Sequence, residues 1–551
     1  MKDTALKYAL QNAIRHDGKA DIGAVIGKIL GNNPSWKQNI KDLQNEVNLV
    51  ISDVNKLGLE EQIKKLGEIA PELLNEEKRD ETKTLPDLPD VKREVIMRIA
   101  PFPSGALHIG NAYPAIINDE YTKRYNGKLL LIIDDTVGSE EKTISKDAYK
   151  LIPDGLKWLG VNFQKKVLYK SNRLKIYYKY AKIIIKKGKA YACSCDSERL
   201  RDNRAKGIEC PCRNNSIKTN LAEFNNMLTK YKEGQAVIRL KTDMKHPNPA
   251  FRDRVLFRIS EKEHPRVKNK YRVWPLLEFS WAVDDHLLGM THIIRGKELM
   301  IESDMERYIW NIFNWPSPVL LHSGLLQIEG VKISKSKARR EVESGEYFGW
   351  DDPRTWSLQS LKRRGFKQQA IRNLFMNIGF TQSEIKVPID SLYAENRKII
   401  DKTCNRYFFI ENPSKLKIKN APKLKVKVPM HPEFQDQGQR LFSTYDEFYL
   451  ADSLEENKTY RLMNLFNFRN SEFISKEHDE KLNAKLIHWL PASKKVVNVE
   501  ILMGDASVKK GLGEYALKKL KVGDQVQFVR FGFCRLDRKE KDKLVFWFTP
   551  T

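Results

Sequence analysis

The stretch MRIAPFPSGALHIGNAY, residues 97–113, decides the fold. The apolar residues that lead up to Ala100 are typical of a strand. Two prolines and Gly105 then break this pattern, and apolar residues return at helical spacing from Leu107 onward. The stretch therefore predicts a strand, a tight loop and a helix.

Three polar or small residues stand where this predicted helix begins. In an open parallel sheet, the carboxyl end of the first strand faces a bound nucleotide, because the following helix points its free N–H groups there. His108 and Asn111 fall on the first helical turn, and Gly110 has no side chain that could obstruct a ligand. We expect these three residues to bind a nucleotide.

A second strand follows in the run KLLLIIDDT, residues 128–136. A short, continuous apolar run of this kind suits a buried parallel strand. Asp134 and its neighbours come at the carboxyl end of the run, so we expect them on the same ligand-binding side as the first loop.

Several motifs in this order resemble those of the class I aminoacyl-tRNA synthetases, specifically the glutamyl-tRNA synthetases of the archaeal and eukaryotic type. HIGN at 108–111 resembles the first ATP motif of the family, with Asn111 where His is commoner, and KISKS at 332–336 resembles the second. IIDDT at 132–136 and GWDDPR at 349–354 keep the family order. The resemblance covers nearly the whole chain.

The resemblance implies an α/β Rossmann-like catalytic domain with a zinc-containing insertion, an N-terminal helical region and C-terminal all-β barrels. Apolar stripes at helical spacing support the first region, and alternating apolar and basic residues support the last. The domains expected are a helical region and linker at 1–90, a catalytic domain at 91–340 with its insertion at about 191–253, a helical subdomain at 341–386, and two β barrels at 387–551 that resemble an anticodon-binding domain.

The two ATP motifs supply the predicted catalytic groups. Release of pyrophosphate concentrates negative charge on the leaving oxygens, and ammonium groups on a mobile loop can stabilise that charge. Lys332 and Lys335 are therefore expected to bind ATP and to act in catalysis together with His108 and Asn111, while Gly110 contributes to ATP binding. Mg²⁺ should be bridged by ATP oxygens, so no protein ligand is predicted for it.

Glutamate carries two carboxylates, and a guanidinium group can bond a carboxylate through two parallel N–H groups without losing its charge. Arg98 and Arg295 are the candidates for this role, and the resemblance adds Ser104 and Asp134 to the substrate site. Bacterial members of the family have a Tyr and an Asn at the positions that match Leu277 and Trp281, so those two roles are not carried over.

Four cysteines lie close together within the predicted insertion. They form two C-x-C pairs, and four thiolates so placed can close a tetrahedral shell around Zn²⁺ that stabilises a loop-rich segment. Because sulfur would fill every coordination position, such a metal would be structural. The alternative is a set of reduced, metal-free thiols. The four residues are Cys193, Cys195, Cys210 and Cys212.

The composition points to a polyanionic partner. The 551 residues include 97 Lys and Arg, and the formal net charge is +26. A surface of this kind attracts nucleic acid in a salt-dependent way, although a merely soluble Lys-rich protein would share the charge. The sequence contains no apolar run of membrane-spanning length and no signal peptide, so we expect a cytosolic protein without membrane contact. We also expect the protein to be a monomer.

The motifs favour one function over two alternatives. The favoured reaction activates L-glutamate with ATP and Mg²⁺ and transfers it to tRNA(Glu), with tRNA(Gln) left open as a second substrate. Glutaminyl-tRNA synthetase is the first alternative, and Ser336 favours glutamate, because Arg is common at that place in the glutamine enzymes. A non-catalytic tRNA-binding protein is the second. Arg363 and Arg364 are expected to be available for phosphate.

Overall fold

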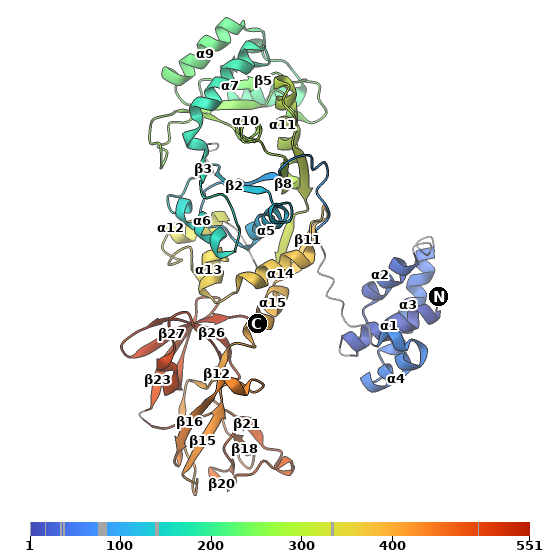
Figure 1. Cartoon of the computed structure of the whole chain (residues 1–551), viewed down its shortest axis with the longest axis vertical. Coiled ribbons are helices and arrows are strands. Elements are labelled where there is room, and N and C mark those ends of the chain that lie inside the picture. Colours follow the sequence, from blue (N-terminus) through green and yellow to red (C-terminus); the bar gives the residue numbers. More distant parts are fainter. Residues whose placement is uncertain are drawn as a thin grey trace. The chain divides into compact units, whose positions relative to one another are not determined.

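The computed structural model describes residues 2–16, 18–33, 36, 39–74, 85–137, 143–331, 335–493 and 495–551. The chain divides into two compact units, Met1–Thr82 and Lys83–Thr551, both drawn in Figure 1. In the part of the chain that is described, no helix is both long and apolar enough to cross a membrane.

The N-terminal unit is a small helical bundle, as predicted. Its core consists of alanine and aliphatic side chains at helical spacing, including Ala9, Leu10 and Val47. Ile63 on α4 (Leu59–Ile69), by contrast, is 41% exposed. The helices are α1 (Lys2–Arg15), α2 (Ile22–Asn32), α3 (Ile40–Val54) and α4 (Leu59–Ile69).

The second unit begins with the predicted strand, loop and helix. Strand β1 (Ile96–Ile99) pairs in parallel with β2 (Lys128–Ile133), and helix α5 (Ile109–Arg124) begins after the loop that follows β1. β2 pairs in turn with β3 (Leu168–Tyr169), also in parallel. The strand–loop–helix prediction is therefore confirmed.

A second parallel pair extends the arrangement on the other side of β1. It consists of β8 (His292–Gly296) and β9 (Val319–Ser323). Thr291, which precedes β8, bonds Ile96 in both directions: its hydroxyl accepts from the Ile96 N–H at 2.9 Å, and its own N–H donates to the Ile96 carbonyl at 2.9 Å. The carboxyl ends of β1, β2 and β8 therefore lie on one side, where a ligand is expected.

The catalytic unit starts earlier than the sequence suggested. The sequence predicted that the N-terminal region and its linker extend to residue 90, but Leu85 and Leu88 are buried in the core around α5. The Leu88 N–H also donates to the hydroxyl of Tyr125 at 2.9 Å. Because these apolar side chains find partners on α5, the compact unit begins at Lys83, and the predicted boundary at residue 90 falls inside it.

The predicted insertion is built on an antiparallel sheet. Its strands are β4 (Ala190–Cys193), β5 (Val237–Leu240), β6 (Val255–Ile259) and β7 (Val273–Pro275), in that order. The sheet thus continues beyond residue 253, where the sequence placed the end of the insertion. Helices α7 (Leu174–Lys186), α8 (Ser197–Lys206) and α9 (Ile217–Thr229) accompany it.

The remaining helices of this unit surround the parallel strands or follow them. They are α6 (Ala148–Trp158), α10 (Leu277–Leu287), α11 (Met300–Phe313), α12 (Lys335–Glu343), α13 (Leu358–Arg363), α14 (Gln368–Ile378) and α15 (Ile389–Ile400). A short parallel pair, β10 (Leu326–Glu329) and β11 (Ile385–Pro388), lies among them. The prediction of β structure from residue 387 is wrong for α15, since Leu392 and Ile400 are buried at helical spacing.

The C-terminal part is β-rich and has two separate cores, as predicted. One core is formed around a seven-stranded sheet with strands β12 (Asn405–Tyr407), β13 (Phe409–Glu411), β23 (Val496–Leu502), β24 (Val508–Glu514), β25 (Gln525–Phe528), β26 (Gly532–Lys539) and β27 (Lys543–Thr549). The other is formed around smaller sheets with strands β14 (Ser414–Lys417), β15 (Leu424–Pro429), β16 (Gln439–Thr444), β17 (Glu447–Leu450), β18 (Thr459–Leu462), β19 (Asn467–Arg469), β20 (Glu472–Ser475), β21 (Lys485–Ile487) and β22 (Leu490–Pro491).

Candidate active site

The first ATP motif forms the start of helix α5. The His108 Nδ1 accepts the N–H of Gly110 at 3.1 Å, and the Asn111 side-chain oxygen accepts the N–H of His108 at 3.2 Å. This reciprocal arrangement is a capping box, which fixes the first turn of the helix. The free N–H groups and the positive end of the helix dipole together favour a bound phosphate at such a place.

The loop before this helix rests on the GWDDPR segment. Gly105 has a φ of +151°, and a Cβ built on it would lie 2.0 Å from Cη2 of Trp350. The indole therefore occupies the space that any side chain at 105 would need. Two further contacts hold the loop, because Leu107 accepts the N–H of Leu358 at 2.8 Å and Ile109 donates to the carbonyl of Trp356 at 3.2 Å.

The second ATP motif is only partly described. Lys332 lies outside the described residues, and so does the side chain of Lys335. Lys335 is the first residue of helix α12, whereas the sequence placed it on a loop. The predicted ATP and catalytic roles of both lysines remain predictions.

Three cationic side chains surround one indole ring on the ligand side of the sheet. The guanidinium carbons of Arg98 and Arg295 lie 4.6 and 4.7 Å from the Trp281 ring centroid, and the Lys170 Nζ lies 5.1 Å from it. The Trp281 Nε1 donates to Asp134 at 2.9 Å. The structure thus brings together three of the predicted substrate residues, Arg98, Asp134 and Arg295, around a tryptophan.

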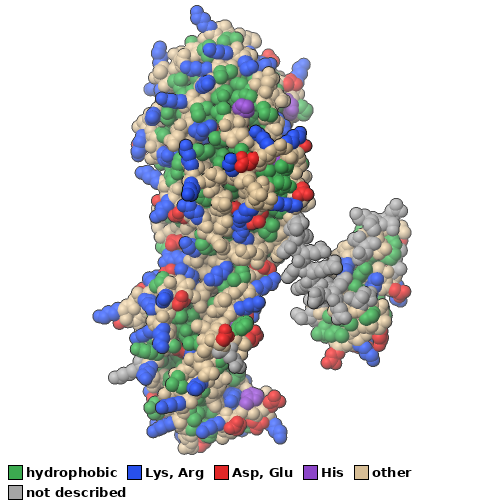
Figure 2. Space-filling model, in the orientation of Figure 1, with side chains coloured by type: hydrophobic (Ala, Val, Ile, Leu, Met, Phe, Trp, Pro, Cys, Tyr) green, Lys and Arg blue, Asp and Glu red, His purple; other side chains and the backbone are tan. Residues whose placement is uncertain are grey.

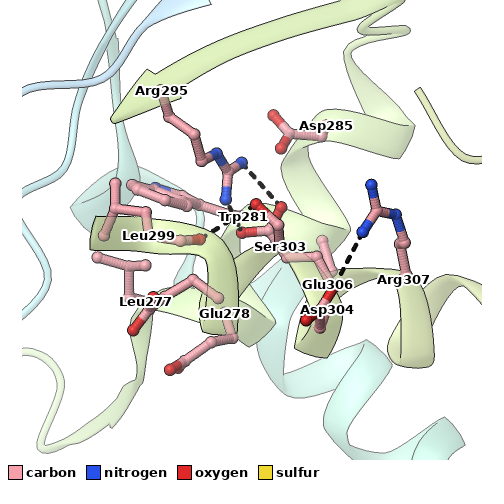
Figure 3. A network of polar contacts seen from close by, with 12 residues as sticks. Leu277, Glu278, Trp281, Asp285, Arg295, Leu299, Ser303, Asp304, Glu306 and Arg307 are labelled. Atoms are coloured by element: carbon pink, nitrogen blue, oxygen red, sulfur yellow. Dashed lines mark hydrogen bonds and ion pairs between the residues drawn. The ribbon is translucent and has the colours of Figure 1, made fainter. Parts of the chain in front are cut away.

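Carboxylates neutralise each of these cations. Arg98 donates through Nε and Nη2 to Asp285 at 2.5 and 2.9 Å. Arg295 donates through Nη1 and Nη2 to Glu306 at 2.8 and 2.9 Å, the contacts drawn as dashed lines beside Trp281 in Figure 3. These forked pairs fix the planes of both guanidinium groups. In each group, two of the three nitrogens donate to a carboxylate, so fewer N–H groups remain for a substrate.

Asp134 lies at the carboxyl end of β2, on the ligand side where the sequence placed it. Its carboxylate accepts from Lys170 at 3.0 Å, from Trp281 and from the hydroxyl of Thr136 at 3.0 Å. These donors occupy both of its oxygens, so Asp134 orders the lysine and the indole. Ser104 lies in the loop before α5, where its N–H donates to the carbonyl of Phe102. Within the described residues, no side-chain hydrogen bond joins Ser104 to this cluster.

Glu306 is fully buried beside Arg295, and burial raises its pKa to about 7 against the opposing effect of the guanidinium. A carboxyl group whose pKa is raised in the folded state stabilises the fold below its unfolded pKa, and this contribution is lost as the pH rises through about 7. We expect the stability of the wild type, relative to Glu306→Gln, to fall by about 1 to 3 kcal/mol between about pH 5 and pH 8.

Thermal unfolding of the full chain across this pH range measures the effect. Glu302→Gln on the same helix α11 is the matched control, because it removes another carboxylate that pairs with an arginine, Arg254 at 3.0 Å. Parallel pH profiles for the wild type and Glu306→Gln would contradict the prediction.

Sequence reasoning missed four residues of this cluster, namely Lys170, Trp281, Asp285 and Glu306. The sequence analysis mentioned Trp281 only because bacterial members of the family have an asparagine at that position. A signal was present, because Trp281 and Asp285 are four residues apart and therefore share one face of α10. Lys170 and Glu306 gave no comparable local signal, since their partners are distant in the sequence.

The four predicted metal ligands do come together. Their sulfur atoms all lie within 4.8 Å of one another, with Cys193–Cys210 at 3.4 Å, Cys195–Cys210 at 3.2 Å and Cys195–Cys212 at 3.8 Å. In a tetrahedral Zn–S₄ site with bonds of about 2.3 Å, neighbouring sulfur atoms are about 3.8 Å apart. The donor set and spacing therefore fit a zinc ion.

Arg363 and Arg364 are not placed as the sequence suggested. Arg364 is 2% exposed and stacks on Trp356, with its guanidinium carbon 4.6 Å from the ring centroid. Arg363 makes a forked pair with Asp537 on β26, at 2.8 Å for both bonds. The expectation that both are available for phosphate is wrong, because they join α13 to its neighbours.

A helix that begins at the carboxyl ends of parallel strands is the arrangement typical of nucleotide-binding α/β enzymes. The family described as tRNA synthetases class I (E and Q), catalytic domain, matches residues 94–402, and two anticodon-binding domain models of the same group match 404–487 and 486–537. The chain belongs to this family of class I tRNA synthetases, as its motifs suggested.

Two relatives that match over nearly their full length come from archaea. The glutamate–tRNA ligase of Methanocaldococcus jannaschii is 42% identical over 99% of both chains, and that of Pyrococcus furiosus is 43% identical over 98% of both. A crystal structure of a glutamate tRNA ligase from Elizabethkingia meningosepticum with its amino acid covers 57% of this chain and 71% of that one, at 18% identity and a TM-score of 0.42, a likeness too weak to carry an argument.

Proposed function

We propose that this protein is a glutamate–tRNA ligase. It activates L-glutamate with ATP to glutamyl-adenylate and transfers the glutamyl group to the terminal ribose of tRNA(Glu). The observation that carries the proposal is the identity of 42 to 43% to enzymes of this name over nearly the full length of both chains. The paired guanidinium groups of Arg98 and Arg295 support it, since they suit a dicarboxylic substrate.

The first step joins glutamate to AMP. A carboxylate oxygen of glutamate attacks the α-phosphorus of ATP, the bond to the bridging oxygen breaks, and pyrophosphate leaves with the bonding electrons. His108, Gly110 and Asn111 hold the nucleotide at the start of α5, while Lys332 and Lys335 stabilise the charge on the leaving group. Mg²⁺ bound together with ATP would offset part of the phosphate charge. The chain mainly positions reactants, as phosphoryl-group chemistry requires.

The second step releases AMP. A ribose hydroxyl at the tRNA 3′ end attacks the carbonyl carbon of the mixed anhydride, and the bond to the phosphate oxygen breaks. Arg98 and Arg295 hold the carboxylate that does not react, and both guanidinium groups pack against the Trp281 ring. We keep Ser104 and Asp134 as candidates at this site, Asp134 acting through Lys170.

Basic side chains offer the tRNA an extended surface. Lys and Arg are spread over the face of residues 83–551 drawn in Figure 2. On α7, four exposed lysines recur every three or four residues, and none of them forms an ion pair within the described part of the chain. Such a row can neutralise successive phosphates of an RNA backbone. These residues are Lys175, Lys179, Lys182 and Lys186.

The test is ATP-dependent charging of total tRNA with labelled glutamate or labelled glutamine, followed by identification of the charged tRNA. We expect glutamate to be attached to tRNA(Glu). Attachment of glutamine alone would instead support the glutaminyl enzyme, and tRNA binding without charging would support a non-catalytic protein. The same assay decides whether tRNA(Gln) is a substrate. We further propose a cytosolic monomer, which size-exclusion chromatography and fractionation test.

We propose that the four cysteines bind one structural Zn²⁺. The ion would join β4 to the loop around Cys210 and Cys212, a segment with few apolar residues of its own. We expect the purified chain to contain about one zinc ion per molecule, and Cys210→Ser to lose most of it. Metal analysis by mass spectrometry measures the content.

A matched control is available for this prediction. Cys404→Ser changes another buried cysteine that lies outside the cluster, and it should keep the metal. Limited proteolysis should cut Cys210→Ser faster between residues 194 and 215. An equal and negligible zinc content in wild type and both variants would favour the metal-free alternative.

A further inference from the structure

Helix α13 touches the ATP loop at its beginning. The Ser357 hydroxyl caps the helix by accepting the N–H of Ser360 at 2.9 Å, and Ser357 forms an isolated β-bridge with His108. Leu358, the first helical residue, donates to Leu107. Trp356, which accepts from Ile109, has a φ of +54°, a strained value for a large side chain that surrounding contacts must maintain. The start of α13 therefore supports the loop that carries HIGN.

The other end of α13 is held by the β-rich part. The last carbonyls of a helix lack partners within it and need donors from elsewhere. Here Arg535 on β26 donates to the Arg363 carbonyl at 3.4 Å, Thr549 on β27 donates to that of Arg364, and Gln525 on β25 donates to that of Gly365 at 2.7 Å. Three strands of one sheet thus cap the helix.

Arg363 strengthens this junction. Its guanidinium pairs with both oxygens of Asp537 and, through Nη1, with Asp351 at 2.8 Å. The guanidinium carbon also lies 4.3 Å from the centroid of the Trp547 ring. Asp351 follows Trp350, the residue that fills the space beside Gly105. One side chain therefore joins β26, β27 and the segment beneath the ATP loop.

Helix α13 has six residues and is about 9 Å long. We propose that it is a rigid connection through which the placement of the β-rich domain sets the position of the ATP loop, with Arg363 and Asp537 as its positioning residues. The proposal rests on the proposed function, because it requires a tRNA that engages the β-rich domain and the active site together. A tRNA that engages only the active site gains nothing from this connection.

The test compares whole tRNA(Glu) with a minihelix that contains only its acceptor arm. In the wild type and in Asp537→Asn, the kcat/KM for ATP is measured with each RNA. We expect Asp537→Asn to lower it about 10-fold with whole tRNA and by less than about twofold with the minihelix. Asp452→Asn is the matched control, because Asp452 also accepts a forked pair, from Arg530 at 2.8 and 3.0 Å, but joins the two β cores to each other. It should leave both values within about twofold.

A second variant guards against a general folding defect. Gln525→Ala removes the cap on Gly365 without leaving a buried charge, and it should lower the whole-tRNA value about threefold with an unchanged minihelix value. Equal losses with both RNAs, or no loss with whole tRNA, would overturn the proposal. If the wild type attaches no glutamate to tRNA, the proposed function fails before any variant is compared.

Discussion

Replacement of Arg98 by lysine should lower kcat/KM for glutamate about 100-fold, because a hydrogen bond between charged groups is worth up to about 3 kcal/mol. Nε and Nη2 of Arg98 bind Asp285, so Nη1 is the donor that we assign to the substrate. Lysine has one ammonium group, which cannot serve Asp285 and glutamate with the same geometry.

The choice of lysine separates catalysis from stability. Asp285 is 1% exposed, and removal of its partner would leave a buried charge, at a cost of about 3 to 5 kcal/mol. An ammonium group keeps this carboxylate neutralised. We therefore expect Arg98→Lys to unfold within a few degrees of the wild type, and its defect to appear mainly in the KM for glutamate rather than in that for ATP.

The neighbouring pair supplies the control. Arg173 donates through Nε to Asp284 at 2.7 Å, on the same helix α10. Arg173→Lys makes the same substitution at the partner of Asp284, which is adjacent to Asp285 in the sequence. The KM of this variant for glutamate should equal that of the wild type. Equal defects in the two variants would mean that the cluster is only a structural ion-pair network. A normal KM for glutamate in Arg98→Lys would mean that Arg98 does not bind the substrate.

The local parts of this site could be predicted from the sequence, and the long-range parts could not. The capping box of His108 and Asn111 joins residues three apart, so the motif itself contained the geometry. The pair of Arg98 with Asp285 joins residues 187 apart. Only the folded sheet brings β1 next to α10, and no spacing rule reveals this.

The errors at domain boundaries have a similar cause. Leu85 and Leu88 lie in a stretch whose charge is typical of a linker, and their burial depends on α5. Conversely, the helix α15 begins directly after Pro388 and follows a strand, so a switch from period two to helical spacing was missed. Composition averaged over a stretch conceals a few apolar residues that find a partner elsewhere.

Gly105→Ala should lower the rate of ATP–pyrophosphate exchange about 100-fold or more, since a displacement of about 1 Å in a positioning loop can have an effect of this size. The new Cβ would lie 2.0, 2.3 and 2.8 Å from three carbons of the Trp350 ring. The φ of +151° is also unfavourable for alanine. The loop must move, and it carries the start of α5 with it.

Gly188→Ala separates the clash from the backbone effect. Gly188 also has a positive φ, of +65°, but a Cβ there would meet nothing within 4 Å. We expect a loss of about 1 kcal/mol in stability and a normal exchange rate. A normal rate in Gly105→Ala would instead show that the loop tolerates the displacement and that the Trp350 contact does not position ATP.

The cause of the defect can be tested in the double variant. Trp350→Leu removes the ring atoms that the new methyl group would meet, so this second substitution should restore part of the exchange activity lost in Gly105→Ala, even if it lowers activity by itself. Two residues in contact are expected to be non-additive in this way. Additive losses would assign the defect to the backbone conformation at 105. Recovery would establish the indole of the GWDDPR segment as the surface that holds the ATP loop in place.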